Sequence, residues 1–380
     1  MTIYLDNAAT SHPKPPTVYD SLANCLQIAG ANPGRAGHKM ARLAQQIIED
    51  TRLKLAKLIN ANSLNQIIFT FNATDALNMA IKGILSPGDH VITSRLEHNS
   101  VLRPLQKLAQ KDISLTFIDF SPDGFISPKD IEKAIRPETK LVVITAASNV
   151  LGTLQPIVEI GEVARKNNLL FLVDAAQILG VLPVNVEAMK IDLLASSGHK
   201  GLMGPPGTGL LYVGARAQVK SWREGGTGGD SLSIFQPSSL PTGLEAGTHN
   251  LLGIAGLSAA LDYLAKETIE KVRDHELSLM MCLIHGLREI PEVTLYGTLD
   301  LAQKVGVQSF SVIGYSSDEV ATILDEHFDI AVRGGLHCAP LAHQALGSAP
   351  DGLVRVSIGA FNTMADIEIF ILAIKEIVKG

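Results

Sequence analysis

The stretch IDLLASSGHKG, residues 191–201, joins an apolar run to a loop of small residues that carries a lysine. The run at 191–195 predicts a buried strand, and serine and glycine dominate the loop that follows. A solvated lysine has no need of this position, whereas a lysine that a small molecule must reach does. Lys200 is therefore the first candidate for a functional residue.

Similar apolar runs recur between about residues 65 and 215, separated by segments with the spacing of amphipathic helices. Several runs are apolar throughout, as expected of strands that are covered on both faces. The alternation predicts an α/β fold with a mainly parallel central sheet and helices on both sides. The predicted strands are QIIFTF, HVITS, LTFIDF, KLVVITAA, LLFLVDAA, DLLASS and GLLYV. The predicted helices are ATDALNMAIKGIL, SVLRPLQKLAQK, SPKDIEKAIR and IVEIGEVARKNN.

The rest of the chain predicts a smaller second part. Residues 216–250 are rich in Gly, Ser and Pro and predict an irregular segment, and residues 254–290 carry one long helical pattern. A smaller α+β domain follows. We expect an N-terminal arm at 1–15, a large domain at 16–255 and a small C-terminal domain at 256–380. The small domain is predicted from strands VQSFSVIG and LVRVSIG and helices SSDEVATILDEH and MADIEIFILAIKEIVKG.

Composition narrows the class of protein. Of the 380 residues, 46% are hydrophobic and 18% charged, which suits a globular chain with a sizeable core. The net charge of −6 and the lack of a basic run argue against nucleic-acid binding. No signal peptide and no apolar stretch of roughly 20 residues appears, so we expect a cytoplasmic protein. Three widely separated cysteines, Cys25, Cys282 and Cys338, argue against a disulfide framework or a metal site.

Asp174 and Lys200 follow two successive predicted strands, at the edge of the sheet where ligands gather in open α/β folds. A buried carboxylate and a buried amine are both costly unless each is engaged. Pyridoxal 5′-phosphate (PLP) would engage both, because it forms a Schiff base with lysine and its protonated ring nitrogen pairs with a carboxylate. A plain Asp–Lys salt bridge at the sheet edge is the alternative reading.

The stretch FTFNATDALNMAI reads as strand, small polar turn and helix, and it offers a cradle for a phosphate. Ala73 and Thr74 would lie at the start of the helix, where free N–H groups and the helix dipole favour an anion. A simple helix cap by Asn72 or Thr74 predicts the same backbone.

These motifs, VDAAQ, SSGHKG and the turn at Thr74, occur in the order found in the class V aminotransferase family, and the chain resembles that family of fold-type I PLP enzymes. The resemblance runs from YLDNAAT at 4–10 to VRVSIGAFNT at 354–363, and it includes SNVLGT at 148–153 and EAGTHN at 245–250. With RGGLHCAP at 333–340 the chain looks like a cysteine desulfurase of the branch with a short cysteine loop, which lies close to selenocysteine lyase.

The resemblance implies a role for each matching residue around the cofactor ring. Lys200 would form the Schiff base and Asp174 would hold the ring nitrogen. Gln177 would bind the ring hydroxyl, with Asn149 near that hydroxyl and the substrate. His98 would stack on the ring and assist proton transfer, although it could equally cap a strand. Asn149 could be an ordinary turn residue.

The phosphate group has its own set of matching residues. Thr248 would reach the phosphate of a neighbouring subunit, which implies a homodimer, although an ordinary loop hydroxyl is the alternative. Ala73 departs from the family's usual hydroxyl residue and offers only its N–H. The residues that the resemblance assigns to the phosphate within one chain are Ala73, Thr74, Ser197 and His199.

Cys338 matches the cysteine that takes up sulfur. Its Gly-rich loop suits a thiol that must approach a substrate, and nearby His337 and Arg333 would favour the thiolate. Arg355 would grip the substrate carboxylate, with Arg333 as a second substrate-binding residue. Arg355 could instead be exposed on its strand, and Cys338 could be a packed small residue. The double glycine of the loop departs from the family pattern and suggests a mobile loop.

The expected reaction removes sulfur from L-cysteine, leaving a persulfide on Cys338 and releasing L-alanine. Sulfur would then pass to an acceptor protein or thiol, as in iron–sulfur cluster assembly. A selenocysteine lyase or a cysteine or cystine C–S lyase of the same fold is the nearest alternative. A PLP-binding partner protein without turnover is the alternative from another class.

Overall fold

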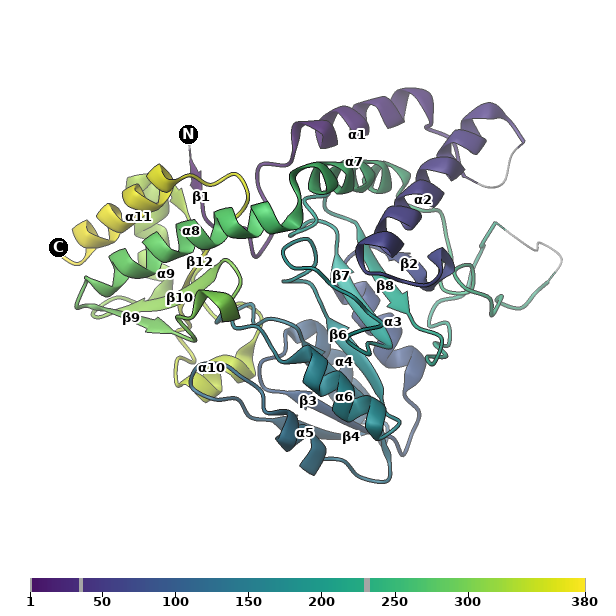
Figure 1. The fold of residues 1–380 in the computed structure, drawn as a ribbon, viewed down its shortest axis with the longest axis horizontal. Coiled ribbons are helices and arrows are strands. Elements are labelled where there is room, and N and C mark those ends of the chain that lie inside the picture. The colour runs from purple at the N-terminus through teal and green to yellow at the C-terminus, as the bar shows by residue number, and fades with distance from the viewer. Residues whose placement is uncertain (1, 34–36, 229–232, 380) are drawn as a thin grey trace.

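The structure, a computed structural model, describes residues 2–33, 37–228 and 233–379. Its centre is a seven-stranded sheet of order β2-β8-β7-β6-β5-β3-β4 (Figure 1). All neighbours from β7 to β4 pair in parallel, whereas β8 is antiparallel to both of its neighbours. The α/β prediction and each predicted strand are confirmed. The strands are β2 (Ile67–Thr70), β3 (His90–Ser94), β4 (Ser114–Ile118), β5 (Thr139–Thr145), β6 (Leu170–Asp174), β7 (Leu193–Ser197) and β8 (Gly209–Val213).

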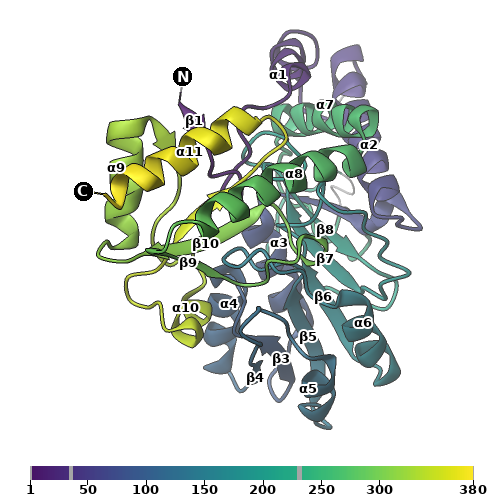
Figure 2. The same ribbon diagram turned by 60° about the vertical axis from the view of Figure 1, so that its left-hand side comes forward.

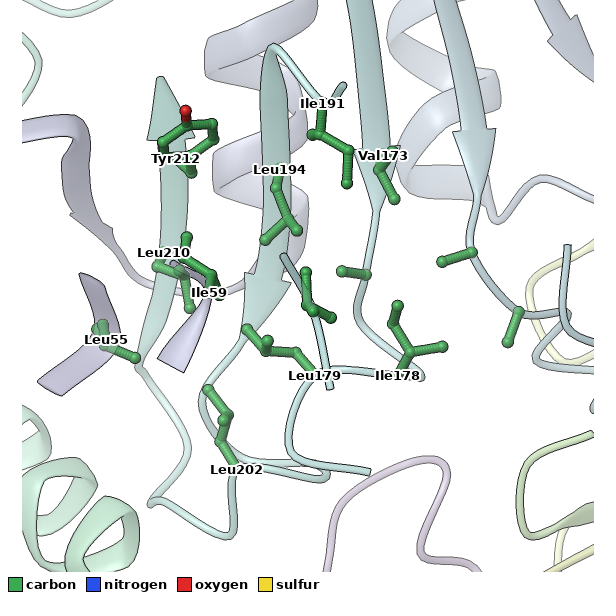
Figure 3. Packing of buried hydrophobic residues seen from close by; sticks show 14 of the residues in the cluster. Leu55, Ile59, Val173, Ile178, Leu179, Ile191, Leu194, Leu202, Leu210 and Tyr212 are labelled. Carbon is green, nitrogen blue, oxygen red and sulfur yellow. The ribbon is translucent and has the colours of Figure 1, made fainter. Parts of the chain in front are cut away.

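Helices cover both faces of this sheet, because successive strand residues point to opposite sides. In β7, Leu194 joins the core beneath α2, whereas Leu193 joins the core beneath α3 and α4. Leu194 and Leu210 lie on the same face as Leu55 of α2 (Figure 3). The helices of this part are α1 (Pro16–Ile28), α2 (Lys39–Leu58), α3 (Ala73–Ile84), α4 (Asn99–Ala109), α5 (Pro128–Lys133), α6 (Ile157–Lys166) and α7 (Leu251–Glu267).

A smaller sheet with its own helices lies beside the large sheet (Figure 2), and a separate hydrophobic core fills this part. Its antiparallel sheet has the order β12-β10-β9. The N-terminal arm reaches this part, since β1 pairs in parallel with β11. Its elements are β1 (Ile3–Tyr4), α8 (Ile269–Arg288), β9 (Val293–Tyr296), β10 (Val307–Val312), α9 (Ser317–Phe328), β11 (Ile330–Ala331), α10 (Pro340–Leu346), β12 (Val354–Ser357) and α11 (Met364–Ile377).

The prediction of one helix at 254–290 is wrong, because the chain turns at Thr268. That residue has φ 65° and ψ 141°, and its hydroxyl accepts the N–H of Lys271 as the N-cap of α8. Helix α7 packs on α1 and α2, whereas α8 packs on α11. The proposed boundaries at 15/16 and 255/256 remain predictions, and the change of packing partners falls at Thr268.

Between β8 and α7 the described residues form no helix or strand, as the composition of 216–250 indicates; residues 229–232 lie outside the described part. Within the ranges that the structure describes, no helix is long and apolar enough to cross a membrane.

Gly198 fixes the path from β7 to Lys200, and it generates a testable prediction. A Cβ on Gly198 would collide with Oγ1 of Thr208, so Gly198→Ala should lower the free energy of unfolding by about 1–3 kcal/mol. Gly225→Ala is the matched control, because its Cβ would meet only Ala246, at an ordinary 3.7 Å. Denaturant unfolding of both variants is the measurement, and equal stability would contradict the account.

Candidate active site

The carboxyl ends of β6 and β7 bring Asp174 and Lys200 to one cavity. Asp174 pairs with Ala195 in the register of these neighbouring strands, and Lys200 follows β7 by three residues. Both side chains line a cavity between the two parts of the molecule. The other predicted site residues that line it are Ala73, Thr74, His98, Asn149, Gln177, Ser197, His199, Arg333 and Arg355.

Asp174 and Lys200 are close enough to influence each other without pairing. Desolvation lowers the pKa of Lys200 to about 8, against the opposing charge of Asp174. Burial likewise raises the pKa of Asp174, which is 5% exposed. No ion pair within 4.0 Å joins these two described residues, so the plain salt bridge is not what the structure contains. The amine of Lys200 and the carboxylate of Asp174 could therefore each interact with a ligand bound in the cavity.

The start of α3 has the features of an anion cradle. Asn72 caps the helix by accepting the N–H of Asp75 at 2.8 Å, and the hydroxyls of Thr74 and Ser100 lie 2.7 Å apart. Across the same cavity, Oγ of Ser197 and Nδ1 of His199 are buried, and neither atom has a hydrogen-bond partner among the residues that the structure describes. Orphaned buried polar atoms are costly, so these two atoms call for a ligand that accepts or donates hydrogen bonds. A phosphate fits them.

His98 both caps a helix and lines the cavity. Its Nδ1 accepts the backbone N–H of Ser100 at 3.0 Å at the start of α4, where a strand cap had been the alternative. Desolvation, together with the charges of Lys200 and three arginines, lowers the pKa of His98 to about 4. The ring is therefore neutral near pH 7, and because Nδ1 accepts, its proton is on Nε2.

Arg355 is 1% exposed, so the alternative of an exposed strand residue is wrong. Its Nη2 lies 2.6 Å from Oδ1 of Asp6 in the N-terminal arm, and its Nη1 donates to the carbonyl of Asn149 at 3.1 Å. Gln177 donates to the carbonyl of Ala8 at 3.2 Å. The arm and the small part of the molecule thus complete the cavity together.

Cys338 is half-buried and does not itself line the cavity, but it contacts a residue that does. Nη2 of Arg333, which lines the cavity, lies 3.5 Å from Sγ of Cys338. The glycines of the loop have packing reasons. A Cβ on Gly334 would meet Oδ1 of Asp318 at 2.6 Å, and Gly335 has φ 92°. Mobility is not needed to explain them.

The structure does not bring Thr248 to this cavity. Thr248 is exposed and lines separate hollows near Arg52 and Glu245. The remaining cysteines are packed residues: Cys25 is buried in the large core and Cys282 packs against the small one.

Several residues of the site escaped sequence reasoning. Asp6 stands in the quoted YLDNAAT motif, but nothing local indicates that it meets Arg355 across the fold. Ser100 and Thr145 also line the cavity. Glu97 is fully buried behind it, and burial raises its pKa to about 8. A Glu–His pair at a strand end was the one available signal for Glu97.

Comparison with known proteins agrees with this geometry. A family model described as aminotransferase class-V matches residues 3–370, so the chain belongs to the aminotransferase class-V family, as its motifs predicted. Members of this family use pyridoxal phosphate.

Within the family the chain is similar to cysteine desulfurases. It is 36% identical to a probable cysteine desulfurase of Pyrococcus abyssi, over 100% of this chain and 94% of the relative. It is 34% identical to a cysteine desulfurase of Serratia proteamaculans, over 99% and 93% of the two chains. An apo structure of a cysteine desulfurase from Thermococcus onnurineus NA1 superposes with a TM-score of 0.94 at 35% identity, covering 100% of this chain and 95% of the other. The resemblance to cysteine desulfurases that the sequence motifs indicated is therefore confirmed.

The Asp6–Arg355 pair generates a prediction about stability. Asp6→Asn leaves the buried guanidinium without its counter-charge and should lower the free energy of unfolding by about 2–3 kcal/mol. Asp262→Asn removes the exposed partner of Lys54 and should cost less than about 1 kcal/mol. Denaturant unfolding at one pH compares the two, and a larger loss in Asp262→Asn would contradict the assignment.

Proposed function

We propose that this chain is a PLP-dependent cysteine desulfurase in which Cys338 takes sulfur from L-cysteine. One observation carries the proposal: Arg333 lines the cavity that holds Lys200 and Asp174, and the same guanidinium contacts the thiol of Cys338. A PLP-binding protein without turnover has no use for a thiol at this position. An ordinary aminotransferase has none either.

The residues present fit the cofactor. Lys200 would hold it through its amine, Asp174 would pair with its ring nitrogen, and His98 would lie against the ring. Gln177 and Asn149 would bind near the ring hydroxyl. The residues available for the phosphate are Ala73, Thr74, Ser197 and His199. When bound, pyridoxal phosphate supplies an electron-accepting ring that stabilises negative charge at the Cα of an amino acid.

The cationic side chains of the cavity would orient the substrate. Arg355 keeps its guanidinium at the cavity wall through Asp6, and a guanidinium binds a carboxylate in a bidentate manner. Arg333 adds a second positive charge between the carboxylate site and Cys338. With a pKa of about 8, the amine of Lys200 can both take a proton from Cα and return one near neutral pH.

The sulfur transfer balances without a further reactant. The thiolate of Cys338 attacks the sulfur of L-cysteine, and the new S–S bond forms as the Cβ–S bond breaks. The electron pair of the broken bond stays on the carbon, which takes up a proton. The products are L-alanine and a persulfide on Cys338.

The same proposal includes a homodimer in which the exposed Thr248 serves the phosphate site of the neighbouring subunit. It also includes transfer of the persulfide sulfur to an acceptor protein or thiol, as in iron–sulfur cluster assembly. L-Cysteine is the proposed substrate, with L-selenocysteine as the closest competitor. The cytoplasmic location stays a prediction.

The first test concerns Lys200. Lys200→Ala should lose the adduct that borohydride traps between the cofactor and the peptide holding residue 200, and alanine formation should fall about 10²–10⁴-fold. Lys129→Ala, an exposed lysine of α5, is the control and should keep both. Peptide mass spectrometry and alanine analysis are the measurements. A trapped adduct elsewhere in Lys200→Ala would refute the assignment.

The second test concerns Cys338. Cys338→Ala should keep the bound cofactor but lose the added sulfur that mass spectrometry detects on the peptide holding residue 338, because the accepting thiol is gone. Cys282→Ala, a half-buried cysteine outside the cavity, should transfer sulfur normally. Unchanged alanine release from Cys338→Ala would show that Cys338 does not accept the sulfur. Release of pyruvate in place of alanine by the wild-type protein would identify a C–S lyase.

A further inference from the structure

Cys338 has a backbone conformation that residues other than glycine seldom adopt. His337 has φ 48° and Cys338 has φ 58°, so two successive residues are left-handed. Such a turn persists only where surrounding contacts determine it. Two of these contacts hold the loop on the large part of the molecule: the carbonyl of His337 accepts from Asn149 Nδ2, and that of Cys338 accepts from the Asn99 N–H, both at 2.7 Å.

A second set of contacts runs through two histidine rings on the other side of the loop. Nε2 of His337 lies 3.1 Å from the carbonyl oxygen of Arg333. Nδ1 of His337 lies 3.3 Å from Nε2 of His343, and Nδ1 of His343 lies 2.8 Å from Oγ of Ser348. This row of hydrogen bonds therefore links helix α10 and the segment after it to Arg333, the first residue of the cysteine loop.

Only one arrangement of protons satisfies every member of this chain. A carbonyl can only accept, so His337 carries its proton on Nε2, and its Nδ1 must accept from Nε2–H of His343. Nδ1 of His343 then accepts from the hydroxyl of Ser348. The Ser348 hydroxyl could instead donate to the carbonyl of His343, at a longer 3.4 Å, and accept from Nδ1–H of His343. Nε2 of His343 would then carry no proton, and two acceptor nitrogens would face each other between the rings.

Both rings are buried: His337 is 2% exposed and His343 is 0% exposed. Burial lowers the pKa of His337 to about 2 and that of His343 to about 4. The two rings are therefore neutral near pH 7, and His343 remains the donor and His337 the acceptor of the hydrogen bond between them. A neutral, fully satisfied polar chain of this kind fixes one packing arrangement of the groups around it.

We propose that His343 is a positioning residue for the thiol of Cys338: through His337 it holds the left-handed turn that presents the thiol to the substrate sulfur. His343 itself does not line the cavity of Lys200. This inference rests on the proposed role of Cys338 as sulfur acceptor. Since a displacement of about 1 Å can cost roughly 100-fold in rate, loss of the turn should slow sulfur transfer without weakening substrate binding.

The test compares three variants of the full-length holoenzyme. His343→Leu removes the donor to His337, whereas His343→Gln keeps an amide N–H in its place. His90→Leu is the matched control, because His90 is equally buried and makes two hydrogen bonds, to Thr139 and Thr116, far along the sheet. The readouts are the single-turnover rate of sulfur transfer to Cys338, the KM for L-cysteine, and deuterium exchange in the peptide spanning 333–341.

His343→Leu should transfer sulfur about 10- to 100-fold more slowly with an unchanged KM, and exchange at 333–341 should rise at least tenfold. His343→Gln should recover most of the rate, and His90→Leu should leave both loop exchange and rate near wild type. A wild-type transfer rate in His343→Leu, or a loss of equal size in His90→Leu, would overturn the positioning role.

Failure of the proposed function would look different. In that case the wild-type protein itself would place no sulfur on Cys338 from L-cysteine. The deuterium exchange comparison would still decide whether His343 holds the loop, since it needs no turnover. Unchanged exchange in His343→Leu would contradict the inference whatever the reaction is.

Discussion

The site depends on two opposite charges that share one cavity without touching. Asp174 closes a strand of the buried sheet, and Lys200 follows the neighbouring strand, so the fold itself brings both to one edge. Water cannot solvate them fully there, which is why the pKa of Lys200 falls and that of Asp174 rises. A direct salt bridge would relieve both shifts. No such bridge joins these two described residues, so neither group compensates the burial of the other by direct pairing.

The second constraint is the joining of distant segments around this cavity. The arm contributes Asp6, the turn that follows β5 contributes Asn149 and the small sheet contributes Arg355, and these three are linked by an ion pair and a hydrogen bond. A buried guanidinium is tolerated because it is paired. The arrangement holds the Arg355 guanidinium at the cavity wall without using flexible surface side chains, so the geometry of the cavity depends on the docking of the small part.

The cysteine loop follows a related logic. Its glycines permit close approach to Asp318 and a left-handed turn, and its histidine is locked by a neutral hydrogen-bond chain. Arg333 lines the cavity, and its Nη2 lies 3.5 Å from the sulfur of Cys338. The thiol of Cys338 is thus held near the cavity by backbone and ring contacts, and the guanidinium of Arg333 lies beside it.

The sequence alone indicated the sheet, because runs such as LLFLV at 169–173 and LVVI at 141–144 are apolar on both faces, as expected of strands that helices cover on both sides. It also indicated Lys200, Asp174 and Cys338, since each lies at the end of a predicted strand or in a loop rich in small residues. Only the tertiary structure decided that Arg355 is buried, that Asp6 pairs with it, and that the helix pattern at 254–290 breaks at Thr268. Those outcomes depend on residues hundreds of positions apart or on a single backbone angle, and neither leaves a local periodic trace in the chain.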